Sequence, residues 1–240
     1  MKGLHILAID TSGKTASVAV TDGEKLLWEK TVYTRLTHSQ VILPMVSEAL
    51  KELGLGFGDI SLAAIAKGPG SYTGLRIGCA AVKGMCLGQE SLKCIGISTL
   101  EALSFNCLPY VGKIAAVMFA RAGICYAGIY ESDGRTIKGL RADEVIKEDE
   151  LFSSLDVSGG LMLVGDHAQA IKDRFFVDDD RVITAPLSVR LQKASSLCLA
   201  AAAHIDEAGD ADGLEVSYLQ ATKAQKDKAH SENQGKEETK

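Results

Sequence analysis

Residues 4–33 read LHILAIDTSGKTASVAVTDGEKLLWEKTVY, and their pattern predicts three consecutive strands. The stretch begins with an apolar run, residues 4–10, that ends in a carboxylate. Apolar and polar residues then alternate over 15–21 and again over 25–33, which is the period of a half-buried strand. The dipeptide Asp22-Gly23 separates these two stretches, and both of its positions tolerate the positive φ of a tight hairpin turn. The chain is therefore expected to open with three antiparallel strands.

The stretch that follows, up to residue 105, alternates helix and strand signals. Its apolar residues take a helical period after Thr37, where Thr37 or Ser39 can cap the helix start and Gly54 can end it. The pattern then predicts a strand, a helix, a strand and a helix, at 62–66, about 72–87, 94–97 and 99–105. Three strands, helix, strand, helix, strand and helix is the order of a ribonuclease H-like unit. Actin-like proteins carry this unit twice.

A second copy of the unit is indicated further along the chain. Apolar strands are expected at 114–120 and 124–130, and Asp133-Gly134 repeats the hairpin dipeptide before a third strand at 136–141. The remainder predicts a strand at 161–164, a short helix after Asp166 and a long apolar helix at about 189–208. We therefore expect an α/β protein of the actin-like ATPase (ASKHA) fold with two ribonuclease H-like subdomains, the second degenerate. The expected divisions are 1–107 for the N-terminal subdomain, 108–222 for the second, and 223–240 for a disordered tail.

Composition narrows the class of protein. The 240 residues carry a formal net charge of -5, whereas a chain that grips nucleic acid by itself is normally basic. The chain is therefore not expected to be the main grip on RNA or DNA. The six cysteines form no C-x-x-C pair and lie mostly in apolar surroundings, which is typical of reduced thiols in a cytosolic protein. The apolar run at 3–9 is too short for a secretory or membrane segment, so we expect a cytoplasmic protein.

Two segments have the pattern of a phosphate site. An aspartate followed by two hydroxyl residues closes the first strand, where actin-like ATPases hold a metal carboxylate and phosphate-binding hydroxyls, although such a triplet is as often a turn former. A glycine-rich loop joins strand to helix at 68–70, where backbone N–H groups can hold an anion or simply permit a tight turn. It lacks the G-K-[ST] ending of a P-loop. We interpret these residues as a vestige of a nucleotide site: Asp10, Thr11, Ser12, Gly68 and Gly70.

Four strings resemble the TsaB family, also called YeaZ. They are LAIDTS at 7–12, THSQVILPMV at 37–46, GPGSYTGLRIG at 68–78 and GISTLEAL at 96–103. The resemblance is strong over 4–105 and weaker beyond. Its later echoes are Ala120-Arg121 and Tyr218-Leu219, where the family commonly shows Asp-Ala-Arg and Tyr-Leu-Arg and this chain has Phe119 and Gln220.

The resemblance implies a non-catalytic partner subunit. Proteins of this family pair with TsaD, which transfers a threonylcarbamoyl group to N6 of adenosine 37 in tRNAs that read codons starting with A. A small ATPase, TsaE, joins the pair, and a TsaC-type synthase supplies the threonylcarbamoyl-adenylate. The resemblance also suggests a homodimer when the chain is alone. No cofactor is expected.

The metal motif of TsaD is not matched. TsaD carries N-H-x-x-x-H on a helix, so that two histidines on one face reach one ion. Thr99 and Leu103 stand at these positions here, and leucine cannot ligate a metal. We therefore expect no catalytic metal.

The resemblance also implies that the partners join through their first two helices in a four-helix arrangement. These helices hold more apolar residues than one sheet-facing stripe needs, and we expect Val41, Met45, Ala81 and Met85 to form an exposed patch. The alternative is that both sides of the helices are buried within the monomer. Small residues would let a facing helix approach closely. The predicted interface comprises Val41, Ile42, Met45, Val46, Ala49, Gly74, Gly78, Ala81 and Met85.

Two alternative functions remain open on the sequence. The first is a nucleotide-hydrolysing enzyme of the actin-like class. The missing second acid, where the duplicated position reads Phe119-Ala120-Arg121, argues against it. The second is a peptidase, since His38 stands beside Ser39. Neighbours in sequence rarely point at each other, and no aspartate is placed to orient the ring, so a capping or surface histidine is the simpler interpretation.

Overall fold

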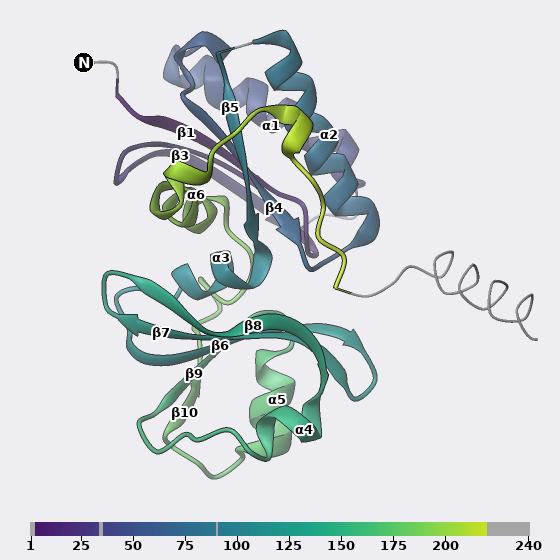
Figure 1. Ribbon diagram of the computed structural model, residues 1–240, viewed down its shortest axis with the longest axis vertical. Helices are drawn as coiled ribbons and strands as arrows, with labels where there is room; N and C mark the ends of the chain where they lie inside the picture. The colour runs from purple at the N-terminus through teal and green to yellow at the C-terminus, as the bar shows by residue number, and fades with distance from the viewer. Residues whose placement is uncertain (1–2, 34–35, 90, 220–240) are drawn as a thin grey trace, which may run out of the picture.

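The computed structural model describes residues 3–33, 36–89 and 91–219, and it contains two five-stranded mixed sheets (Figure 1). The first sheet is formed by β1 (His5–Asp10), β2 (Thr15–Asp22), β3 (Lys25–Tyr33), β4 (Leu62–Gly68) and β5 (Lys93–Ser98). Its order is β3-β2-β1-β4-β5, with β1, β2 and β3 antiparallel and β1, β4 and β5 parallel. The tail predicted at 223–240 lies outside the described residues.

The second sheet repeats this topology. It is formed by β6 (Val111–Arg121), β7 (Ile124–Asp133), β8 (Ile137–Lys147), β9 (Leu161–Val164) and β10 (Val182–Thr184). Its order, read from the edge, is β8-β7-β6-β9-β10, with the same antiparallel and parallel pairs. The predicted fold class is thus confirmed: the chain contains two ribonuclease H-like units in an actin-like arrangement. We call them the first unit and the second unit.

Two long helices cover the outer face of the first sheet. They are α1 (His38–Leu53) and α2 (Tyr72–Gly88), and a 3₁₀ turn, η1 (Phe57–Asp59), follows α1. As predicted, Thr37 is the N-cap of α1 and Gly54, with φ 65°, ends it. Alternate residues of β1, Leu7 and Ile9, pack under these helices. Both faces of β1 are buried, which explains its continuous apolar run.

At the junction, the last helix of each unit packs on the sheet of the other unit. The first unit ends in α3 (Thr99–Phe105), whose Leu100 and Leu103 pack on the second sheet. The second unit ends in α6 (Ala194–Ala203), whose Leu197 and Cys198 pack beneath β1 and β2 of the first sheet. Both helices therefore lie between the two sheets, as Figure 1 shows.

The far face of the second sheet carries shorter helices. These are α4 (Glu148–Phe152) and α5 (Ala168–Phe175), and after α6 come two 3₁₀ turns, η2 (Ile205–Glu207) and η3 (Ala211–Gly213). The degenerate second unit thus keeps the whole element order, but its α4 and α5 are shorter than α1 and α2. The predicted helix at 189–208 is wrong at both ends, and β10 and α4 were not predicted. In the part of the chain that the structure describes, no helix is long and apolar enough to cross a membrane.

Candidate functional site

The end of β1 carries the aspartate and hydroxyls predicted for phosphate. Asp10 is buried, and its Oδ1 accepts hydrogen bonds from the Ser12 backbone N (2.9 Å) and from Ser12 Oγ (2.6 Å). Thr11 Oγ1 donates to the carbonyl of Gly74 in α2 (2.7 Å). Burial raises the pKa of Asp10, while the two bonds from Ser12 oppose that rise. Both hydroxyls therefore hold the turn and α2 in place.

The glycine-rich loop packs directly on this turn. The Ser71 backbone N donates to the Ser12 carbonyl at 2.7 Å. A Cβ at Gly70 would stand 2.3 Å from the Ser12 carbonyl oxygen, and a Cβ at Gly74 would stand 2.0 Å from that of Thr11. The glycines are needed for close approach of two backbones. That the five residues descend from a nucleotide site stays a prediction.

Gln192 fills the space between this turn and the second sheet. Its buried side chain lies so close to Gly13 that a Cβ there would meet it at 2.6 Å, and its Nε2 lies 3.5 Å from Met118 Sδ. Its carbonyl accepts from Thr15 Oγ1 at 3.3 Å. The chain's own side chains therefore occupy this part of the junction between the units.

The strand register gives the residue of the second unit that is equivalent to Asp10, and it is not the residue predicted from the sequence. In the first unit Ile9 pairs with Ile65, the fourth residue of β4, and in the second Ala116 pairs with Val164, the fourth residue of β9. The position equivalent to Asp10 is therefore Val117. It is a buried apolar residue, whereas the predicted position, Phe119, lies further along β6.

The predicted exposed patch on α1 and α2 is wrong for two of its four residues. Met45 and Met85 are buried, at 4% and 8% exposure, in the core beneath the two helices, because α1 turns this face toward β2 and α2. Of the nine predicted interface residues, only Val41 and Ala81 are partly exposed, and the other seven are buried: Ile42, Met45, Val46, Ala49, Gly74, Gly78 and Met85.

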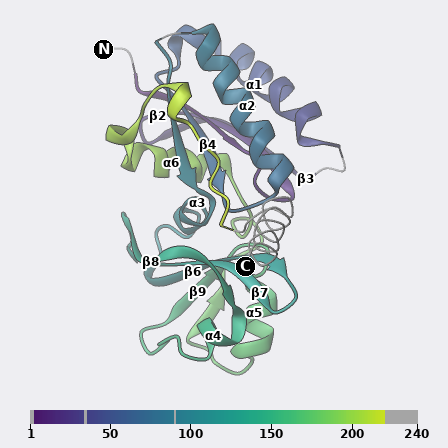
Figure 2. The ribbon, with the colours of Figure 1, turned by 45° about the vertical axis from the view of Figure 1, so that its right-hand side comes forward.

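A different face of the same helices forms an apolar groove. Two adjoining pockets of about 310 Å³ each lie between α1 and α2, and they share Leu43, Ala80 and Ala81. The remaining lining residues are Ser39, Ile42, Phe57, Ile77, Gly84, Met85 and Gly88. Leu43 is 54% exposed. We call this surface the α1–α2 groove. Figure 2 shows the two helices side by side on the side of the first sheet away from the second unit.

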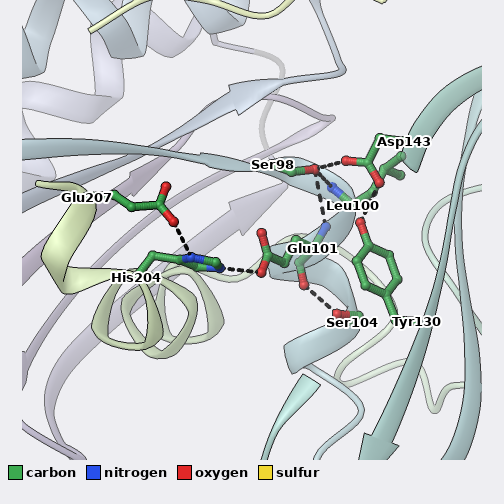
Figure 3. Close-up of polar contacts among 8 residues, drawn as sticks. All are labelled: Ser98, Leu100, Glu101, Ser104, Tyr130, Asp143, His204 and Glu207. Carbon is green, nitrogen blue, oxygen red and sulfur yellow. Dashed lines mark hydrogen bonds and ion pairs between the residues drawn. The ribbon is translucent and has the colours of Figure 1, made fainter. Parts of the chain in front are cut away.

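A polar network, shown in Figure 3, ties the two units together. Ser98 caps α3 by accepting from the Leu100 and Glu101 backbone N atoms, and its hydroxyl donates to Asp143 of β8. Tyr130 of β7 donates to the same carboxylate at 2.5 Å. Asp143 therefore joins the end of β5 to the second sheet.

His204 stands beside this network, and each of its ring nitrogens contacts a carboxylate. Its Nε2 lies 2.7 Å from Glu101 and its Nδ1 2.9 Å from Glu207, and these bonds raise its pKa. His38 is the histidine that was weighed for peptidase chemistry. The hydroxyl of its neighbour Ser39 contacts Thr37 Oγ1 at 3.0 Å. Thr99 and Leu103 are buried. Across the described ranges, no three His, Cys, Asp or Glu side chains gather closely enough to hold a metal ion.

Known proteins match this chain over most of its length. The family profile described as "TsaD: tRNA N6-adenosine threonylcarbamoyltransferase" matches residues 33–226. The TsaB protein of Bacillus subtilis (strain 168) is 30% identical over 175 residues, which cover 71% of this chain and 76% of that one. TsaB of Escherichia coli (strain K12) is 34% identical over 174 residues, covering 71% and 74%.

A solved structure has the same fold. YeaZ from Pseudomonas aeruginosa superposes with a TM-score of 0.78 at 24% identity, and the match covers 90% of this chain and 100% of that one. The identities to the curated TsaB proteins extend over two thirds of both chains. The chain therefore belongs to the TsaB (YeaZ) family of tRNA threonylcarbamoyladenosine biosynthesis proteins.

Proposed function

We propose that this chain is the non-catalytic dimerisation and scaffold subunit of the complex that makes N6-threonylcarbamoyladenosine at position 37 of tRNAs reading codons starting with A. Its role is to bind and support TsaD, the catalytic subunit. The observation that carries the proposal is the α1–α2 groove, an apolar surface bordered by the exposed side chains of Leu43 and Phe57. A contiguous apolar surface of this kind is typical of a protein interface.

The groove has the shape that a pair of helices requires. Ala80, Ala81 and Gly84 are among its lining residues, and such small residues let a second helix come close. The TsaD profile covers α1 and α2 of this chain, so TsaD is expected to offer an equivalent helix pair. Two equivalent pairs pack face to face about a pseudo-two-fold axis, which gives a four-helix interface.

The remaining partners follow from family membership. The TsaE ATPase joins the pair, and a TsaC-type synthase delivers the threonylcarbamoyl-adenylate. When the chain is alone, a second copy covers the groove and gives a homodimer. Contact with tRNA is indirect, and the complex works in the cytoplasm.

The proposal is tested with charges placed in the groove. Leu43→Asp and Ala80→Glu replace exposed residues, so each variant should stay folded. An unpaired carboxylate buried by the partner costs several kcal/mol, so affinity for TsaD should fall by at least about 100-fold. Size-exclusion co-elution with TsaD and the tRNA modification level are the measurements. Leu187→Asp, at a position 83% exposed in the second unit, is the matched control.

Folded groove variants that still pair with TsaD at wild-type affinity would place the interface elsewhere. Loss of pairing in the Leu187 variant as well would mean that the effect is not specific to the groove.

A further inference from the structure

Two segments that are far apart in the sequence meet beside the α1–α2 groove. Tyr72 and Arg76 come from the first turns of α2, and Tyr218 comes from the segment after η3. The Arg76 guanidinium lies over the Tyr72 ring, 4.0 Å from its centroid, and Arg76 Nε donates to the Tyr218 hydroxyl at 2.9 Å. The centroids of the two tyrosine rings are 5.0 Å apart. Both segments belong to strings that resemble the TsaB family. None of these three residues lines the groove itself.

The two tyrosines fix the orientation of the Arg76 guanidinium, which keeps N–H donors available for a partner. An arginine has five N–H donors in a planar fork, and here the bond to Tyr218 uses one of them. Within the described residues, Arg76 makes no ion pair, and neither does Lys83 two turns further along α2. An exposed arginine normally loses conformational freedom when it binds an anion, so a side chain that is already held in place binds at a lower entropy cost.

The two cations border a hollow of about 460 Å³. Its apolar wall is formed by Cys79, Ala80, Leu214 and Val216. Ala80 also lines both pockets of the α1–α2 groove, so the hollow and the groove are adjacent across α2. A partner helix that fills the groove therefore reaches the edge that carries Arg76 and Lys83.

We infer that Arg76 and Lys83 form a basic rim of the partner interface and pair with carboxylates of the subunit seated in the α1–α2 groove. The inference rests on the proposed function and adds the charge that the partner must present. Seven residues of helix rise by about 10 Å, so the matching acids are expected about two turns apart on one partner helix, or at an equivalent spacing.

A protein carboxylate fits this rim better than the phosphate backbone of RNA. Glu215 lies on the wall of the same hollow, and the chain carries a net charge of -5. An RNA strand brings a negative charge with every nucleotide, and several of these would face Glu215. A folded partner can place its carboxylates opposite the two cations alone.

The test compares binding of TsaD to the full chain at low and high salt. The double variant Arg76→Gln/Lys83→Gln should bind about 10-fold more weakly at about 50 mM NaCl, mainly through a slower association rate. The difference should nearly vanish at about 500 mM NaCl, because salt screens exposed charge pairs. The matched control is Arg135→Gln/Lys138→Gln, which removes two exposed charges of the second unit and should leave the affinity unchanged.

Each other outcome would overturn the inference. An unchanged affinity in the double variant, together with lost binding in Leu43→Asp, would refute the rim and leave the proposed function standing. Wild-type binding by both variants would refute the proposed function as well. A loss of affinity that persists at high salt would mean that Arg76 acts by holding the segment of Tyr218. A loss of tRNA binding with unchanged TsaD binding would assign the rim to RNA.

Discussion

The first and second units share one strand order but present different outer surfaces. In the first unit α1 has 16 residues and α2 has 17, whereas the corresponding α4 and α5 of the second unit have 5 and 8. The long pair leaves the α1–α2 groove between its helices. The short pair is largely occupied in covering its own sheet, where Leu151, Phe152 and Ile171 are buried. A duplicated topology can therefore be retained in both units while a surface suited to a partner is formed in one.

Both units also retain a close contact that only glycine permits. In the first unit Gly74 lies against the Thr11 carbonyl, and in the second Gly165 lies against the Val117 carbonyl. In the first unit the contact lies between α2 and the residue after β1, and in the second it lies between the residue after β9 and β6 itself. A close contact at a glycine is thus present in both units, whereas the proposed partner surface lies on the first.

The largest effect is expected for a charge in the first unit's core. Met45→Asp should abolish folding, because a carboxylate would be buried among apolar side chains at a cost of several kcal/mol. Leu43→Asp, two residues away on the exposed side of α1, should fold normally. Circular dichroism melting distinguishes them. A wild-type melting curve for Met45→Asp would show that α1 is rotated relative to the arrangement described above.

A smaller effect should appear in both units. A Cβ at Gly74 or at Gly165 would stand 2.0 Å from a backbone oxygen, and Gly165 also has φ 113°. Overpacking of this kind costs about 1–3 kcal/mol, so Gly74→Ala and Gly165→Ala should each lower the free energy of unfolding in urea by about that amount. If only one substitution destabilises the protein, the two contacts do not play the same part.

Gly84→Ala should separate stability from binding in the first unit. A Cβ at Gly84 meets nothing within 4 Å, and alanine is the better helix former, so the free energy of unfolding should rise by about 0.5–1 kcal/mol. Gly84 lines the α1–α2 groove, so the added methyl group should weaken TsaD binding. Urea denaturation and a binding titration measure the two quantities. A variant that is more stable and binds equally well would exclude Gly84 from the interface.

The smallest effect concerns the histidine beside the junction of the units. Glu101, and then Glu207, raise the pKa of His204 above 6.5, so its stabilising contribution is fully present below pH 6.5 and is lost as the pH rises through the raised value. The side chain is 34% exposed, so the contribution should stay below about 1 kcal/mol. His204→Gln should lower the melting temperature at pH 6 and match the wild type at pH 9. An equal loss at both values would show that packing, not charge, is responsible.

The sequence predicts the first unit closely because its signals are local. Thr37 and Gly54 mark the two ends of α1, and the alternation over 25–33 marks β3. The end of the second unit lacks such signals. The apolar run of α6 is buried on several sides and has no single stripe, so its period could not locate its ends, while the three residues of β10 are too few to show a period.

The candidate site was predicted less well from the sequence. It depends on how α1 is rotated about its own axis and on contacts between distant segments. Met45 and Leu43 are both apolar and two residues apart, and only the packing of α1 determines which of them faces the core. The contact of Arg76 with Tyr218 joins segments that nothing in their local patterns connects. The family resemblance indicated α1 and α2 as the partner-binding helices, which stays a prediction, and the structure identified which of their faces is exposed.

The helix exchange between the units has a consequence for synthesis on the ribosome. The face of β1 and β2 opposite α1 and α2 is covered by α6, which ends at Ala203. All five strands of the first sheet have been made by residue 98, yet the inner face of β1 and β2 stays without its covering helix until α6 has emerged from the exit tunnel. The first unit must therefore wait, with one apolar face in water, for most of the second to be translated, so it cannot complete its fold in the order in which it is made.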